Sequence, residues 1–282
     1  MININGILVP PSEATFGLTN RGYAYGDALF ETIRYASGKL LFWEDHYFRL
    51  MAGMRILRME IPMDFTPEKL EEQIVACISA NGISESVARI KITVYRDTDG
   101  LYTPDANTVG YTIAANKMER QAFYTLSDTP YEVALFKDHY MAPDLLSTLK
   151  TTNKVLNVLG SIYAKENGYQ NCLLLNSEKK VIEALNGNLF LVKGTHIKTP
   201  PLLDGCLRGV MRKQLLQLLQ KNETYTVEEA SISPFELQKA DELFITNVIQ
   251  GIVPITKFRK KEYTSDVSKR LLGQVNAAVR FA

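Results

Sequence analysis

Residues 88–94 read Ala-Arg-Ile-Lys-Ile-Thr-Val, the clearest strand in the chain. Apolar side chains at every second position are typical of a strand with one buried face and one open face. Residues 109–115, Val-Gly-Tyr-Thr-Ile-Ala-Ala, are its expected partner. Strands and helices elsewhere do not alternate strictly along the chain. The sequence therefore predicts a mixed α+β fold and argues against a doubly wound parallel sheet.

The composition is that of an ordinary globular chain of 282 residues, 46% hydrophobic and 22% charged, with a formal net charge of +1. Such a balance gives no charge excess to attract nucleic acid or an anionic membrane. No apolar run approaches the roughly 18 residues of a membrane helix, and no secretory signal opens the chain. Three scattered cysteines form no CxxC pair. We expect a cytoplasmic protein that binds neither nucleic acid nor membrane.

Turn and cap residues mark the element boundaries. Asn5-Gly6 and Ser37-Gly38 predict hairpins, and Thr66-Pro67 opens a helix that Asn81-Gly82 closes. The polar stretch 116–130 is the best candidate for a linker. We expect a domain at 1–118, a linker at 119–126 and a second domain at 127–282. Further helices are expected at about 44–57, 153–167, 208–221 and 266–281, and further strands at about 131–137, 172–175, 181–184, 189–192 and 243–246.

Lys150 lies between an apolar run and the expected start of a helix, in Leu149-Lys150-Thr151-Thr152-Asn153. Partial burial would lower the pKa of a lysine there and make its neutral amine a nucleophile. A Schiff base with a carbonyl compound requires such an amine. Taken alone, the feature favours the alternative of an ordinary surface lysine.

Glu183 interrupts an apolar strand, Val181-Ile182-Glu183-Ala184, and the small residues of 186–188 follow it. A buried carboxylate needs a partner, which a protonated pyridine nitrogen would supply. Glycine at 187 lets the backbone approach a ligand closely. Local sequence alone favours a solvent-facing glutamate.

Three segments have the residue types of a phosphate site. Gly209 opens a helix whose first amides point out of its end. The turn Asn247-Val248-Ile249-Gln250 offers further amides, and Arg49 offers a guanidinium that can bind phosphate through two nitrogens. The alternatives are a common glycine–helix junction and, for Arg49, a structural ion pair.

Several other site types have no support in the sequence. It contains no GxGxxG, phosphate-loop, HExxH or GxSxG motif. Its histidines, His46, His139 and His196, show no metal-ligand spacing, and no metal site is expected.

Taken together and in chain order, these segments resemble the class IV pyridoxal-phosphate enzymes, the group of branched-chain aminotransferases, D-amino acid aminotransferases and aminodeoxychorismate lyases. Residues 20–34, with Arg21-Gly22 and Gly26-Asp27-Ala28-Leu29-Phe30-Glu31, are similar to the family's RGxxxGDxxFExxR stretch. The resemblance continues through 45–50, Lys150 with Asn153, Glu183 with 188–190, and 209–212, and ends within 241–254. Each motif is weak alone, but their order and spacing together are specific.

The resemblance implies pyridoxal 5′-phosphate as cofactor and a D-amino acid aminotransferase-like fold. That fold has a small α+β N-terminal domain and a larger pseudo-barrel C-terminal domain, and it forms a homodimer. Lys150 would form the Schiff base and move the proton on the substrate's α-carbon. Glu183 would keep the pyridine nitrogen protonated. The other cofactor-binding positions implied are Arg49, Asn188, Gly209, Val210, Met211, Asn247 and Val248, and the substrate positions are Phe30, Arg96 and Tyr102.

The resemblance leaves two reactions open. One is transamination of an amino acid. The other is elimination of pyruvate from 4-amino-4-deoxychorismate to give 4-aminobenzoate on the folate route. Phe30 and the lack of an Arg-x-His pair in 96–102 argue against D-amino acid specificity, while Met211 and 246–249 look more similar to the lyases. We expect an aminotransferase, with the lyase as alternative. A non-catalytic ligand-binding protein on the same fold is the remote alternative, since binding alone requires neither Lys150 nor Glu183.

Overall fold

A computed structural model describes residues 1–127 and 129–281, and the chain divides into two compact units. The first unit is Met1–Ala122 together with Lys150–Asn153. The second holds Phe123–Leu149 and the chain from Lys154 onward. We describe each unit by itself.

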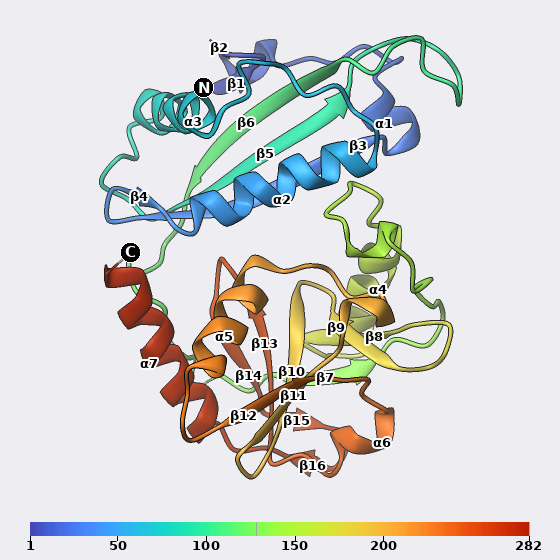
Figure 1. Ribbon diagram of the computed structural model, residues 1–282, viewed down its shortest axis with the longest axis vertical. Helices are drawn as coiled ribbons and strands as arrows, with labels where there is room; N and C mark the ends of the chain where they lie inside the picture. The colour runs from blue at the N-terminus through green and yellow to red at the C-terminus, as the bar shows by residue number, and fades with distance from the viewer. Residues whose placement is uncertain (128, 282) are drawn as a thin grey trace. The chain divides into compact units, whose positions relative to one another are not determined.

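The first unit is an antiparallel sheet with α2 and α3 on one face (Figure 1). Its strand order is β2-β1-β6-β5-β3-β4, and every neighbouring pair is antiparallel. Helices α2 and α3 pack against the sheet through contacts with β3, β6 and β1. The elements are β1 (Ile2–Ile4), β2 (Ile7–Val9), α1 (Arg21–Tyr25), β3 (Ala28–Ala36), β4 (Lys39–Leu40), α2 (Trp43–Ile56), α3 (Pro67–Ala80), β5 (Ala88–Arg96) and β6 (Val109–Lys117), with a 3₁₀ turn at Pro11–Glu13.

Local sequence accounts for these elements. Asn5 and Gly6 have φ of 49° and 90°, the left-handed conformation that the predicted hairpin turn requires. The Thr66 hydroxyl accepts the amide N–H of Lys69 and caps α3 as predicted. The alternation of 88–94 is confirmed, because Ile90, Ile92 and Val94 are fully buried under the helices.

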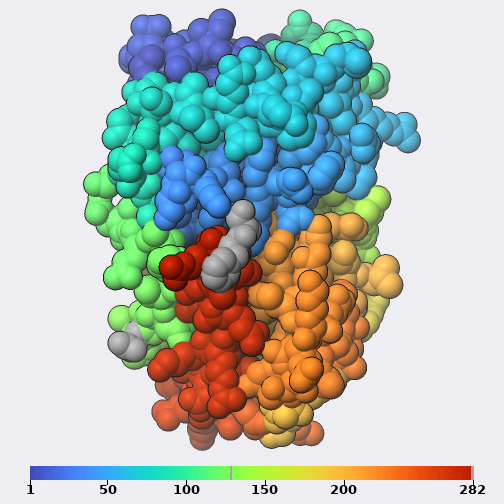
Figure 2. All heavy atoms as spheres, turned by 60° about the vertical axis from the view of Figure 1, so that its left-hand side comes forward, coloured from blue at the N-terminus to red at the C-terminus, as the bar shows by residue number. Residues whose placement is uncertain are grey.

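The second unit is a mixed sheet that curls because one strand pairs with three others. Strand β10 pairs with β9, β11 and β13, so the path β12-β11-β10-β9-β8-β7-β15-β16 branches there toward β13 and β14. Figure 2 shows α7 along the surface of this unit, beside the segment that includes α5. The strands are β7 (Glu132–Leu135), β8 (Asn171–Leu175), β9 (Val181–Ala184), β10 (Gly187–Lys193), β11 (His196–Thr199), β12 (Thr226–Glu229), β13 (Glu242–Asn247), β14 (Gly251–Ile255), β15 (Lys257–Phe258) and β16 (Lys261–Glu262).

Four helices accompany this sheet: α4 (Val155–Glu166), α5 (Val210–Gln220), α6 (Pro234–Leu237) and α7 (Asp266–Phe281), with 3₁₀ turns at Leu146–Thr148 and Leu202–Asp204. All residues of β8 are buried, since Leu173 and Leu175 join one apolar cluster while Cys172 and Leu174 join another. Strands β11 and β12 were not predicted from the sequence, because they are short and polar and lack a clear apolar alternation. The two-unit α+β fold agrees with the predicted class, including the curled sheet of the larger unit.

The units divide differently from the predicted domains at one point. Residues 150–153 were expected in the second domain, at 127–282. In the structure they belong to the first unit, because Thr151 bridges to Leu29 and two backbone hydrogen bonds join the segment to β3. The linker at 119–126 and the boundaries 1–118 and 127–282 stay predictions.

Candidate active site

The backbone of Lys150 is fixed against the first residues of β3. The amide of Phe30 donates to the carbonyl oxygen of Lys150 at 2.9 Å, and the amide of Thr152 donates to that of Ala28 at 3.0 Å. The Nζ of Lys150 lies 4.4 Å from the centroid of the Phe30 ring. The structure therefore brings together two of the predicted residues, Lys150 and Phe30, in the first unit.

The face of the sheet opposite α2 and α3 contains a cavity of about 550 Å³. Strand register places Phe30 opposite Thr93, and Thr32 opposite Lys91, so these side chains share this face. The Nζ of Lys91 lies 5.3 Å from the centroid of the same Phe30 ring. The cavity is lined by Phe16, Gly17, Leu18, Asn20, Gly22, Tyr23, Ala28, Lys91, Thr93, Tyr95, Thr112 and Thr152.

Lys91 was missed in the sequence, although a signal for it was present. Lys91 and Thr93 alternate with the apolar residues of 88–94, so their side chains point to the open face of the strand. In the described part of the chain no carboxylate forms an ion pair with Lys91. A cation on a mainly apolar cavity wall is suited to binding an acid.

Arg49 lies beside Glu31 and His46 under the sheet. Its Nε donates to Glu31 Oε1 at 2.8 Å, and a second nitrogen donates to Oε2. The Nδ1–H of His46 donates to the same Oε2 at 2.7 Å. Burial alone would raise the pKa of Glu31, but the charge of Arg49 and these hydrogen bonds outweigh it and lower the pKa to about 2. The structural ion pair considered for Arg49 is therefore present.

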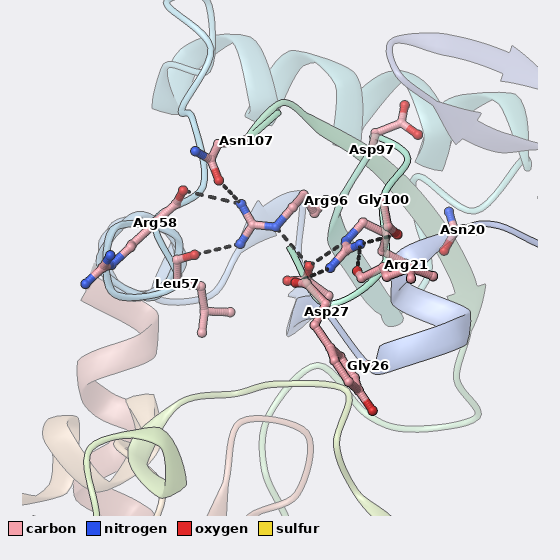
Figure 3. Close-up of polar contacts among 12 residues, drawn as sticks. Asn20, Arg21, Gly26, Asp27, Leu57, Arg58, Arg96, Asp97, Gly100 and Asn107 are labelled. Atoms are coloured by element: carbon pink, nitrogen blue, oxygen red, sulfur yellow. Dashed lines mark hydrogen bonds and ion pairs between the residues drawn. The ribbon is translucent and has the colours of Figure 1, made fainter. Parts of the chain in front are cut away.

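Arg96 is occupied by structural contacts (Figure 3). Its Nε donates to Asp27 Oδ2 at 2.8 Å, and its terminal nitrogens donate to the Asn107 side chain and to the carbonyl oxygens of Leu57 and Arg58. The side chain is 7% exposed. Its three guanidinium nitrogens join β5 to Asp27, to Asn107 and to the chain that follows α2. The expected contact of Arg96 with substrate stays a prediction.

Tyr102 lies on the loop that follows Arg96 and is exposed. Its carbonyl oxygen accepts a hydrogen bond from Arg21, and its ring lies 5.8 Å from that of Tyr25, centroid to centroid. The structure thus groups Tyr102 with Arg21 and α1, and its contact with substrate stays a prediction.

Glu183, Asn188 and Gly209 come together in the second unit. Asn188 faces Glu183 across the β9–β10 pair. The Asn188 amide donates to the Leu207 carbonyl at 2.8 Å, and the Leu207 amide donates to Glu183 Oε2 at 2.9 Å. A Cβ on Gly209 would lie 2.0 Å from Asn188 Oδ1, so any other residue there would displace the Asn188 side chain. The side chain of Glu183 is buried, which corrects the solvent-facing alternative.

Helix α5 begins at Val210 without a side-chain cap and without an acidic residue in its first turn. Its first amides are those of Val210 and Met211, and the positive end of an 11-residue helix favours an anion there. Nearby in the fold, β10 pairs with β13 through Asn188 and Thr246, which places the turn at 247–250 beside Asn188.

The 247–250 turn is held by the side chain of Asn247 and by the distant Tyr124. Asn247 Oδ1 accepts the amides of Ile249 and Gln250 at 3.1 and 2.8 Å. The Tyr124 hydroxyl donates to the Val248 carbonyl at 2.8 Å. The sequence analysis missed Tyr124, which is buried although it falls within the predicted linker, and no local pattern marks its role.

The described part of the chain contains neither a metal-binding cluster nor a membrane-spanning helix. Residues 1–127 and 129–281 contain no group of three or more His, Cys, Asp or Glu side chains able to hold a metal ion. None of their helices has the length and apolar character needed to cross a membrane.

A family model described as amino-transferase class IV matches residues 28–258. The chain belongs to the class IV aminotransferase family. A putative branched-chain-amino-acid aminotransferase of Methanocaldococcus jannaschii is 28% identical over 255 residues, covering 90% of this chain and 86% of the relative. An aminodeoxychorismate lyase of Vibrio harveyi is 26% identical over 282 residues, covering 98% and 100%. The crystal structure of a branched-chain aminotransferase from Thermoproteus uzoniensis with norvaline has a TM-score of 0.88 and 25% identity, covering 99% of this chain and 94% of that one.

Class IV aminotransferases are enzymes that depend on pyridoxal phosphate, which is therefore the cofactor of this chain. The residues present fit that group. An uncapped helix end suits its phosphate, a buried carboxylate in an apolar strand suits its ring nitrogen, and a lysine suits its aldehyde.

Proposed function

We propose that this class IV enzyme is an aminotransferase that acts on an amino acid, with Lys150 as the residue that carries the cofactor. The observation that supports this assignment best is the clamping of Lys150 to β3, with its Nζ over the Phe30 ring. A fixed backbone limits the positions that the amine can occupy, which favours a defined geometry for proton transfer.

The cofactor supplies an electron-withdrawing ring that stabilises negative charge on the substrate's α-carbon. Lys150 Nζ would take the proton from that carbon and later return it. Glu183 would accept a hydrogen bond from the ring nitrogen and keep it protonated; its own orientation is set by the Leu207 amide. Placing this carboxylate in a buried strand strengthens the interaction, because the local dielectric constant is low.

The phosphate would bind at the start of α5, through the amides of Val210 and Met211, with Gly209 leaving room for its approach. Asn188 would hold Leu207 and Gly209 in place, and Asn247 with Val248 would supply the neighbouring turn. Arg49, whose guanidinium binds Glu31, stays a predicted phosphate ligand.

Lys91 favours a substrate that carries a carboxylate on the side of this cavity, next to Phe30. Such acids include glutamate-like amino acids as well as 4-amino-4-deoxychorismate. This observation keeps the lyase, which releases pyruvate and 4-aminobenzoate, as the second candidate. The Vibrio harveyi lyase, which this chain matches over nearly its whole length, also supports that candidate.

The test is the absorption spectrum of the purified holoprotein, recorded with L-glutamate, L-leucine or D-alanine added separately. Conversion of the band of lysine-bound cofactor to that of pyridoxamine phosphate establishes transamination and names the donor. A band that persists with all three, together with pyruvate release from 4-amino-4-deoxychorismate, establishes the lyase instead. Undiminished turnover in Lys150→Ala would refute the assignment of Lys150, and unchanged turnover in Glu183→Gln would refute that of Glu183.

We further propose a homodimer. Helix α4 presents Val155, Val158, Leu159 and Ile162 to solvent, a spacing that forms one apolar stripe. A second copy of the chain would cover this stripe. Light scattering is expected to give twice the 31.8 kDa chain mass, and Val158→Asp is expected to lower it, whereas the same mass in the variant would exclude this face.

We also propose a cytoplasmic location. The three cysteines are all buried and unpaired, which fits a reducing compartment. Cell fractionation with an antibody to the chain would test this, and recovery from an oxidising compartment would contradict it.

A further inference from the structure

The Lys150 segment has a second set of contacts, made by side chains at its far end. Asn153 Nδ2 donates to the carbonyl oxygen of Gly26 at 3.0 Å, and the Thr152 hydroxyl donates to the same oxygen at 3.2 Å. Together with the Thr152 amide bond to Ala28, these contacts tie Gly26, which precedes β3, and Ala28, its first residue, to the two residues that close the segment. Lys150 lies at the other end of this short pairing.

The corner that accepts these bonds is rigid. Gly26 ends α1 in the left-handed conformation, with φ of 63°. The next residue, Asp27, receives the Nε–H groups of two buried arginines on one carboxylate oxygen, Arg21 at 3.0 Å and Arg96 at 2.8 Å (Figure 3). The amide of Arg96 also donates to the carbonyl oxygen of Asp27. Charge-assisted bonds of this kind restrict the backbone that carries the carboxylate.

Asn153 fits closely against this corner. A Cβ on Gly26 would lie 2.3 Å from Asn153 Oδ1 and 2.9 Å from its Cγ, so a side chain at position 26 would displace the amide. Gly26 therefore favours the Asn153 contact in two ways: its carbonyl oxygen accepts the Asn153 N–H, and its lack of a Cβ leaves room for the Asn153 amide.

We infer that Asn153 is a positioning residue for Lys150: its amide, bound to Gly26 at the corner fixed by Asp27, holds the lysine backbone in register with β3. Arg96 helps to fix this corner through its two bonds to Asp27. The inference rests on the proposed function only in that Lys150 is the reacting residue.

The chain offers a matched control. Asn157, on α4, donates through its own Nδ2 to the Leu185 carbonyl at 2.8 Å, so Asn157→Asp removes the same kind of bond within the second unit. Asn153→Asp keeps the shape of the side chain but leaves no N–H to donate. Both variants are compared with the parent chain.

The first readout is amide hydrogen exchange of the cofactor-free protein at Phe30 and Thr152, whose N–H groups pair the segment with β3. Asn153→Asp is expected to speed exchange at both amides about three- to tenfold, the effect of losing one hydrogen bond of ordinary strength. Asn157→Asp leaves both rates unchanged. Equal rates in Asn153→Asp and the parent would overturn the inference.

The second readout uses the holoenzyme. Asn153→Asp is expected to lower kcat about three- to tenfold while KM stays within about twofold, because the contact orients the reacting amine without binding substrate. In Gly26→Ala, which displaces the same amide, adding Asn153→Asp is expected to cause no further loss. Additive losses would overturn the inference. Lys150→Ala separates the two proposals: activity in that variant would refute the role of Lys150, while the exchange result would stand.

Discussion

The Glu31 carboxylate is the group whose removal has the most direct expected effect on stability. It is 1% exposed and is bound by Arg49 and His46. Its pKa falls from 4.5 to about 2, which corresponds to about 3 kcal/mol of stability at neutral pH, at about 1.4 kcal/mol for each pH unit. Glu31→Gln also leaves Arg49 without its counter-charge, and breaking a buried pair costs about 3–5 kcal/mol. We expect a loss in that range.

Urea unfolding followed by tryptophan fluorescence measures this loss. Trp43 is the single tryptophan of the chain and lies on α2, the helix that carries His46 and Arg49. The control is Glu72→Gln, which removes an exposed ion pair with Lys69 and is expected to cost less than about 1 kcal/mol. If Glu31→Gln also costs less than about 1 kcal/mol, the buried pair does not stabilise the unit by the amount that the lowered pKa of Glu31 implies.

The same cluster determines a pH dependence. The lowered pKa of Glu31 gives stability that is present above about pH 4.5 and is lost as the pH falls toward about 2. Burial lowers the pKa of His46 below 6.5, so the unfolded chain binds that proton first, and stability also falls as the pH drops below 6.5. The urea concentration at the unfolding midpoint should fall steadily as the pH is lowered from 7 to 3. In Glu31→Gln the decrease that Glu31 causes below pH 4.5 is expected to be missing. The same pH dependence in the variant and the parent below pH 4.5 would contradict the assignment to Glu31.

Three further changes test the second unit. Met211→Thr adds a hydroxyl at the start of α5 and is expected to lower the Kd for pyridoxal phosphate about three- to tenfold in a fluorescence titration; weaker binding would contradict the phosphate site proposed there. Gly209→Ala forces its Cβ against Asn188 and is expected to weaken cofactor binding by tenfold or more. Unchanged affinity would show that the position of the Asn188 side chain does not matter for cofactor binding. Burial raises the pKa of all three thiols, Cys77, Cys172 and Cys206, to about 11 for Cys172 and about 12 for Cys206. A disulfide reagent at pH 8 should therefore label none of the three until denaturant is added, and rapid labelling of the native protein would contradict their burial.

Local sequence by itself determined the elements whose signals depend on near neighbours. The turns at Asn5-Gly6 and Ser37-Gly38 need positive φ, and Thr66 caps α3 by accepting an amide only three residues away. The alternation of 88–94 predicts which face is buried, because side chains point to opposite faces of a strand in turn. The order and spacing of the segments around Lys150 and Glu183 also predicted the family, which the family model confirms.

Only the tertiary structure decided which distant residues meet. Lys150 pairs with Phe30 across about 120 positions of chain, and Arg96 reaches Asp27 across 69. Tyr124 finds the Val248 carbonyl across 124. Nothing local distinguishes a guanidinium that will be enclosed by structural acceptors from one that will face substrate, since the acceptors belong to other elements. The structural partners of Arg96 are therefore visible only in the fold, and its contact with substrate stays a prediction.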